Sequence, residues 1–311
     1  MSHRKRIFLA AVLLGVAVPV ATVAWLLRDP LPHVAARRSE IANAVETERI
    51  IVGNSELRRI HIVARSGLEF DVNVRQHLAD TAARLPVVVL LGGHVTGGEA
   101  ARIVGETPGI LVVGVSYPFA GDLRPSKLTF LRQIPSIRKA FHDTPAALML
   151  AMDYLYTLPD ADTTRIHGVG VSLGAPFMTI AGALDKRFTN IWAIHGSGGS
   201  YAPLEASMRR SIANAPLRHL SAAIANIIIA GPRLAPERWV SRIAPRRFIM
   251  VNARDDERMP RASVEALYQS ASQPKEQIWM SGGHIHADQP TIQRLVAIIM
   301  ERVSSETDGL D

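Results

Sequence analysis

The stretch "HGVGVSLGAP", from His167 to Pro176, decides the fold of this 311-residue chain. It follows an apolar segment that is typical of a buried strand and precedes a segment with the apolar spacing of a helix. Three interpretations are open: a flexible glycine-rich loop, a nucleotide-binding turn, or a turn that holds a nucleophilic serine. Each predicts a different protein.

The five residues from Gly170 to Gly174 match the pattern G-x-S-x-G. A serine at the tip of a sharp strand-to-helix turn needs small residues two positions before and after it, because the neighbouring chain passes close by. The turn lifts the hydroxyl above the sheet, and the following helix offers its first N–H groups to a developing oxyanion. The pattern therefore favours Ser172 as a nucleophile.

The nucleotide-binding interpretation fits less well. Gly168, Gly170 and Gly174 form a loose glycine pattern, but G-x-G-x-x-G would need glycine where Leu173 stands. That fingerprint also normally opens its domain, whereas this stretch follows several predicted strands. We therefore expect no cofactor.

Apolar runs and helical patterns alternate along the chain from about Ile60 onward. The runs "PVVVLLGGH" (Pro86–His94) and "GILVVGVSYP" (Gly109–Pro118) suit strands that are buried on both faces of a parallel sheet. The alternation predicts an α/β fold with a mostly parallel central sheet and helices on both faces. Residues 201–245 interrupt it with helical sequence, which predicts a small helical cap over a ligand site or an ordinary buried helix pair.

Two local signals refine this outline. Alternating stretches on both sides of Ser66 and Gly67 predict a β-hairpin before the parallel strands. Thr144 followed by Pro145 is typical of an N-cap and a first helical position, so we expect a helix to begin there.

Two later loops supply the partners that a serine nucleophile needs. "VNARDDERMP" (Val251–Pro260) places acids after a predicted strand, and "MSGGHIHADQP" (Met280–Pro290) places histidines after the last one. The carboxyl ends of parallel strands meet at one edge of a sheet, so these loops should converge near Ser172. The order serine, acid, histidine is the one that such a site requires.

On these motifs, the chain from about Ser55 to Val303 resembles the α/β-hydrolase superfamily of serine esterases, lipases and related enzymes. The matching pieces are "VVVLLGGH", "GVGVSLGA", "VNARDDERMP" and "GGHIHADQP". The resemblance implies the α/β-hydrolase fold. It also implies a serine hydrolase that acts on a carboxylic ester.

The resemblance assigns roles residue by residue. It implies Ser172 as the nucleophile and His284, which follows paired glycines, as the base in preference to His286. The family's acid commonly lies four residues before a proline, which selects Asp256, with Asp255 as the alternative.

The oxyanion hole would use the N–H of Leu173 and one from the loop after "VVVLLGG". Gly93 is the expected second donor, followed by His94. Many relatives carry His-Gly-Gly at this point, whereas here Leu91 stands before the two glycines.

A metal site is not expected. His284, His286 and Asp288 resemble part of the H-x-H-x-D-H motif of metallo-β-lactamase-like hydrolases, but the last position is Gln289 and no second ligand cluster is apparent. His195, after another predicted strand, is interpreted as a structural histidine rather than a pocket residue.

The predicted function is hydrolysis of a small-molecule or lipid-like ester through a Ser172 acyl-enzyme. The alternatives are a thioesterase or prolyl-oligopeptidase-like peptidase with the same three residues, and a non-catalytic binding protein that keeps the fold. The sequence leaves the acyl group and the oligomeric state open.

The composition excludes several function classes. The chain is 48% hydrophobic, which is enough for one large core, and it has no cysteine, which excludes disulfides, thiolate catalysis and cysteine-based zinc sites. The net charge of +7 comes from scattered residues, so we expect no nucleic-acid partner.

The N-terminal segment is apolar. Ile7–Leu27 carries no charge and is long enough to cross a bilayer as a helix. We expect residues 1–28 to be a membrane anchor or a cleaved signal segment, residues 29–54 a linker, and residues 55–311 the hydrolase domain. The basic cluster at residues 4–6 favours a catalytic domain on the extracytoplasmic side, secreted or periplasmic if the segment is cleaved.

Overall fold

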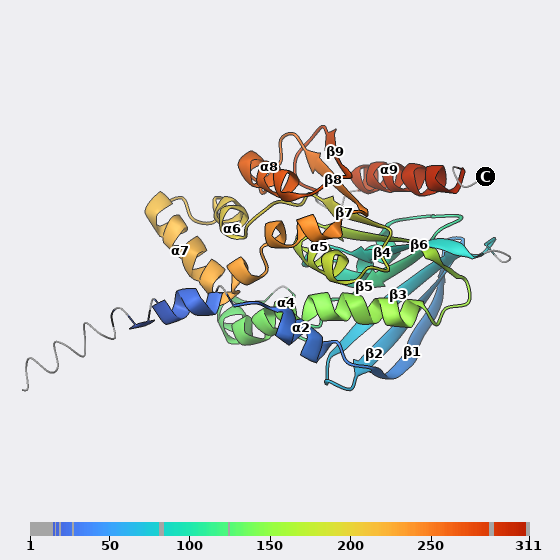
Figure 1. Cartoon of the computed structure of the whole chain (residues 1–311), viewed down its shortest axis with the longest axis horizontal. Coiled ribbons are helices and arrows are strands. Elements are labelled where there is room, and N and C mark those ends of the chain that lie inside the picture. Colours follow the sequence, from blue (N-terminus) through green and yellow to red (C-terminus); the bar gives the residue numbers. More distant parts are fainter. Residues whose placement is uncertain are drawn as a thin grey trace, which may run out of the picture.

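The computed structural model describes residues 15, 17–18, 20–26, 28–80, 84–123, 125–285 and 289–308. A nine-stranded sheet forms the centre, with strand order β1-β2-β3-β5-β4-β6-β7-β8-β9 (Figure 1). The strands are β1 (Ile41–Val52), β2 (Ser55–Ala64), β3 (Glu69–His77), β4 (Leu85–Leu91), β5 (Leu111–Val115), β6 (Ala161–Val171), β7 (Asn190–Ile194), β8 (Arg247–Ala253) and β9 (Lys275–Met280).

Helices lie between and around these strands. The α-helices are α2 (Leu31–Arg37), α3 (Ala100–Ile103), α4 (Lys127–Leu155), α5 (Gly174–Leu184), α6 (Tyr201–Met208), α7 (Ala215–Ile228), α8 (Arg261–Ser270) and α9 (Gln289–Asp308). The 3-10 helices are η1 (Gly97–Glu99), η2 (Gly231–Arg233), η3 (Pro236–Arg238) and η4 (Val240–Ile243).

The sheet is mixed, which qualifies the expectation of a mostly parallel one. Neighbouring strands from β5 to β9 pair in parallel, whereas β1, β2, β3 and β5 pair antiparallel. Short turns join β1 to β2 and β2 to β3, the second at the predicted Ser66-Gly67 hairpin, and such turns allow only antiparallel pairing. The carboxyl ends of the parallel strands share one edge, where the candidate site lies.

Each parallel strand contributes side chains to two apolar layers. On β4, Val87, Val89 and Leu91 pack in the layer that also includes α4, α5 and α8. The alternate residues Val88 and Leu90 pack in the layer that includes α3 and α9. This alternation is the period of two along a strand, and burial on both faces explains the continuous apolar runs in the sequence.

Residues 29–54, which we expected to be a linker, contain α2 and β1. β1 lies at the edge of the sheet and pairs only with β2 among the described strands. Most of its side chains are exposed, so it lacks the apolar alternation that marks a half-buried strand.

Helix α4 corrects the expected helix start at Thr144, because it already begins at Lys127 and runs through Pro145. A proline inside a helix removes one backbone hydrogen bond. In the same turn, the Thr144 hydroxyl donates to the carbonyl of Ala140 at 2.7 Å. The turn thereby gains a side-chain hydrogen bond where the backbone loses one.

The expected transmembrane helix is also corrected. Within the described residues, no helix has both the length and the apolar character that a membrane crossing requires. Residues 1–14, 16, 19 and 27, which include much of the expected span, lie outside the described part of the chain. Trp25 instead packs against the guanidinium of Arg138, which lies 4.3 Å from its ring centroid. The transmembrane helix, and the membrane-anchored extracytoplasmic location inferred from it, therefore lack structural support.

Candidate active site

The turn that carries Ser172 joins β6 to α5 and is sterically fixed. Ser172 has a left-handed backbone (φ 53°), and its N–H donates to the carbonyl of Ile194 at 2.8 Å. A Cβ atom at Gly170 would meet the backbone of α5, and one at Gly174 would meet the carbonyl oxygen of Leu91. Both glycines are therefore required by close backbone approach, as the G-x-S-x-G pattern predicts.

Ser172, His284 and Asp256 form a connected chain of hydrogen bonds. Nε2 of His284 lies 2.9 Å from the Ser172 hydroxyl oxygen, and its Nδ1 lies 2.9 and 3.0 Å from the two carboxylate oxygens of Asp256. Because an ionised carboxylate only accepts, Nδ1 carries the proton and Nε2 of the neutral ring accepts from the hydroxyl. The alternative acid, Asp255, is exposed, and it is Asp256 that contacts the ring.

Asp256 is held in its ionised form. Burial alone would raise the pKa of its carboxyl group, but hydrogen bonds from His195 and His284 outweigh burial and place the pKa far below its ordinary value. Its Oδ1 also accepts the backbone N–H groups of Arg258 and Met259, both at 2.9 Å. These bonds fix the direction in which the carboxylate faces His284.

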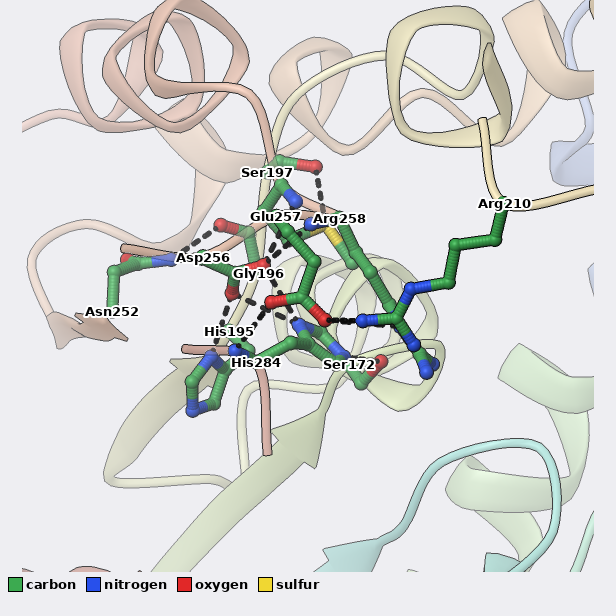
Figure 2. A network of polar contacts seen from close by, with 11 residues as sticks. Ser172, His195, Gly196, Ser197, Arg210, Asn252, Asp256, Glu257, Arg258 and His284 are labelled. Atoms are coloured by element: carbon green, nitrogen blue, oxygen red, sulfur yellow. Dashed lines mark hydrogen bonds and ion pairs between the residues drawn. The ribbon is translucent and has the colours of Figure 1, made fainter. Parts of the chain in front are cut away.

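His195 is a second histidine on Asp256 that the sequence did not reveal. Its Nδ1 lies 2.8 Å from Oδ2 of Asp256, and its ring packs edge-on to that of His284 with centroids 5.0 Å apart (Figure 2). The residue is buried and has a left-handed backbone (φ 49°). The available signal was its place directly after β7, the strand between those that carry Ser172 and Asp256.

Glu257 and Arg210 support the loop of His284. One carboxylate oxygen of Glu257 accepts the backbone N–H of His284 at 3.0 Å, and the other lies 2.8 Å from the Arg210 guanidinium (Figure 2). Arg210 comes from the turn between α6 and α7. The segment 201–245 thus reaches the site through this ion pair.

Two backbone N–H groups beside Ser172 are unused within the described residues. The N–H groups of Leu173 and Gly93 donate to no acceptor in this part of the chain. A Cβ atom at Gly93 would lie 4.0 Å from that of Ser172. The loop is fixed by the carbonyl of Gly93, which accepts from Gly97 at 2.8 Å, and by Tyr117, whose hydroxyl donates to the carbonyl of Gly92 at 2.8 Å.

A cavity of about 460 Å³ adjoins Ser172 and His284. Its walls come from β4, β5, β6, β7, α3 and α9, and they are mainly apolar. None of the described residues that line it belongs to 201–245, the segment from which we expected a cap over the ligand site. The helices α6 and α7 stand to one side of the sheet (Figure 1).

His195, Asp256 and His284 offer three potential metal-ligand atoms within 4.8 Å of one another. Both Nδ1 atoms lie at hydrogen-bond distance from Asp256, so a metal ion would have to displace their protons. His286 and Asp288, from the partial metal motif, lie outside the described residues.

The fold resembles those of solved structures. Acetyl xylan esterase 1 from Thermoanaerobacterium sp. gives a TM-score of 0.61 at 14% identity, over 89% of this chain and 94% of that one. An acetyl xylan esterase from Paenibacillus sp. R4 gives 0.60 at 16%, over 87% and 92%. The α/β hydrolase GrgF from Penicillium sp. gives 0.54 at 15%, over 78% and 97%. No family model and no curated protein matches the sequence.

Proposed function

We propose that this chain, which has the α/β-hydrolase fold, is a serine hydrolase that cleaves a carboxylic ester. The observation that carries the proposal is the hydrogen-bonded chain from Ser172 through His284 to Asp256 at the carboxyl edge of the sheet. The names of similar structures, acetyl xylan esterases among them, favour an ester over other acyl compounds.

In the proposed first step, the Ser172 oxygen attacks the ester carbonyl carbon, and its proton passes to Nε2 of His284. The bond to the alcohol oxygen then breaks, and His284 gives this proton to the leaving alkoxide. Water attacks the remaining acyl-enzyme and gives a proton to the same Nε2. The carboxylic acid leaves as that proton returns to the serine oxygen.

Asp256 and two N–H groups complete the proposed machinery. The carboxylate of Asp256 holds the His284 tautomer whose Nε2 can accept a proton, and it stabilises the imidazolium that forms. The free N–H groups of Leu173 and Gly93 supply donors for the oxyanion of the tetrahedral intermediate. A donor of this kind typically contributes about 10²–10³ in kcat.

A fluorophosphonate probe tests the proposal directly. We expect it to label the folded protein and Ser197→Ala, whose substituted serine lies nearby but donates to Met259, and not to label Ser172→Ala. Absence of labelling of the folded wild-type protein would refute a serine hydrolase. Matched ester, thioester and prolyl-peptide substrates then determine which bond is cleaved fastest, and we expect the ester.

A further inference from the structure

The cavity beside Ser172 is elongated along the sheet. It is lined from Val88 on β4 to Gly92, which directly follows that strand, and four residues of extended chain span about 13 Å. On α9 it is lined from Ile292 to Met300, and eight residues of helix span about 12 Å. The two walls agree on a length of about 12–13 Å.

The orientation of α9 shows which end of the cavity lies far from Ser172. The helix follows the His284 loop, so Ile292 lies at the Ser172 end of the cavity and Met300 lies further from Ser172. Next to Met300, Arg302 pairs with Glu276, which lies near the amino end of β9, at 2.6 Å. The helix therefore runs from the carboxyl edge of the sheet toward the opposite edge.

Polar and apolar side chains divide along this axis. The polar lining residues Ser172, His284, His94 and Arg258 lie at the Ser172 end of the cavity. The α9 wall is Ile292, Leu295, Val296, Ile299 and Met300, with the i, i+3, i+4, i+7 and i+8 spacing of a single helix face. Valines from β4, β5 and β6 form the opposite wall, and Thr107, which precedes the amino end of β5, lies at the end far from Ser172.

We propose that this cavity binds the acyl chain of the substrate, and that the substrates are esters of medium-chain fatty acids. An extended chain advances about 1.2 Å per bond, because the three backbone bonds of an extended residue span about 3.3–3.6 Å, so about 12–13 Å takes about ten to eleven bonds, or a chain of about ten to twelve carbons. The acyl chain stays attached to Ser172 after the alcohol leaves. It is therefore the part of the substrate that an apolar wall can stabilise both during acylation and during hydrolysis of the acyl-enzyme. This inference rests on the proposed function.

The first test measures kcat/KM for p-nitrophenyl esters from two to fourteen acyl carbons. We expect a rise of about threefold to fourfold for each added methylene, up to about ten to twelve carbons, and then a fall. A parallel series of acetate esters with lengthening alkyl alcohols should show no such rise. An optimum at acetate, or a rise only with the length of the alcohol, would overturn the proposal.

A variant that blocks the cavity tests whether the acyl chain of the substrate binds there. Met300→Trp should move the optimum to shorter esters and lower the ratio of kcat/KM for the decanoate ester to that for the acetate ester at least tenfold. Glu301→Trp, at the next position of α9 but exposed, is the matched control and should leave the profile unchanged. Equal profiles for Met300→Trp and the wild-type protein would place the chain elsewhere.

Ligand binding separates this inference from the proposed function. Ser172→Ala cannot form an acyl-enzyme, yet calorimetry should show that it binds decanoate at least tenfold more tightly than butyrate, and that Met300→Trp in the same background removes the difference. If the wild-type protein hydrolyses no ester while this difference persists, the hydrolase proposal fails and the acyl cavity stands. If esters are hydrolysed without a preference in chain length or binding, the cavity proposal fails alone.

Discussion

His195 lies with its Nδ1 2.8 Å from Oδ2 of Asp256, the carboxylate oxygen that also contacts His284. Two buried imidazole rings therefore converge on one carboxylate, which accepts two further hydrogen bonds from the backbone. The contact with His195 restricts rotation of the carboxylate, so His195 is a candidate positioning residue that acts through Asp256.

We expect His195→Ala to lower kcat for a good ester substrate about tenfold, or about 1.4 kcal/mol, with little change in KM. The loss follows because Asp256 is then free to turn away from His284. His195→Asn should recover most of the rate, because asparagine keeps an N–H donor and tolerates a left-handed backbone. Steady-state kinetics, with thermal unfolding measured for each variant, tests this. Equal kcat values for the two variants would show that the hydrogen bond has no role.

The second prediction distinguishes the two neighbouring acids. Asp256→Asn should lower kcat by about 10³–10⁴, because an amide can donate to Nδ1 of His284 and so favour the wrong tautomer. Asp255→Asn should retain wild-type kinetics, since its side chain is exposed. Steady-state kinetics of both variants tests the assignment, and a large loss in Asp255→Asn alone would reverse it.

The three residues of the hydrogen-bonded chain could be predicted from the sequence, because local signals mark each of them. Ser172 needs glycines at fixed offsets, and Asp256 and His284 lie in loops that follow strands. His195 could not be recognised in this way, because its contact with Asp256 depends on β7 lying between β6 and β8, and strand order is a long-range property.

The cavity was missed for a related reason. The helical sequence of residues 201–245 suggested a cap over the ligand site, yet the cavity walls come from α3, α9 and four strands. The apolar residues of α9 that line the cavity have the same spacing as those of any helix that faces a core. Only the packed structure shows that these residues form the wall of a cavity and not part of the core. Strand β1 at the edge of the sheet and the continuation of α4 through Pro145 likewise depend on tertiary contacts, which outweigh local propensity.

The third prediction concerns the ion pair between Arg210 and Glu257. The Arg210 side chain is largely exposed, so the pair itself should contribute only about 0.2–1 kcal/mol. We expect Arg210→Ala to lower kcat less than about fivefold, and Glu257→Ala to lower it more, because Glu257 also accepts the backbone N–H of His284. A double-mutant cycle measures the coupling. A larger effect of Arg210→Ala than of Glu257→Ala would assign Arg210 a direct role instead.

The last prediction concerns stability and Asp143, whose buried carboxylate joins α2 to α4. It lies 2.8 Å from His33, 2.9 Å from Lys139 and 3.1 Å from Arg37. Burial raises the pKa of Asp143, but hydrogen bonds from His33 and Lys139 outweigh burial, so the pKa is lower in the folded state than in the unfolded one. Its contribution is therefore present above a pH of about 4 and is lost as the pH falls below that value.

We expect Asp143→Asn to lower the free energy of unfolding by about 2–4 kcal/mol at pH 7, because two cations, Arg37 and Lys139, and the hydrogen-bonded His33 lose a buried carboxylate partner. Asp153→Asn is the matched control on α4, since that carboxylate also pairs with arginines but is one-third exposed, and it should cost less than about 1 kcal/mol. Urea unfolding between pH 7 and pH 3 measures both variants. The difference between Asp143→Asn and the wild-type protein should shrink below pH 4, and a difference that stays constant with pH would show that the charge of Asp143 is not what stabilises this contact.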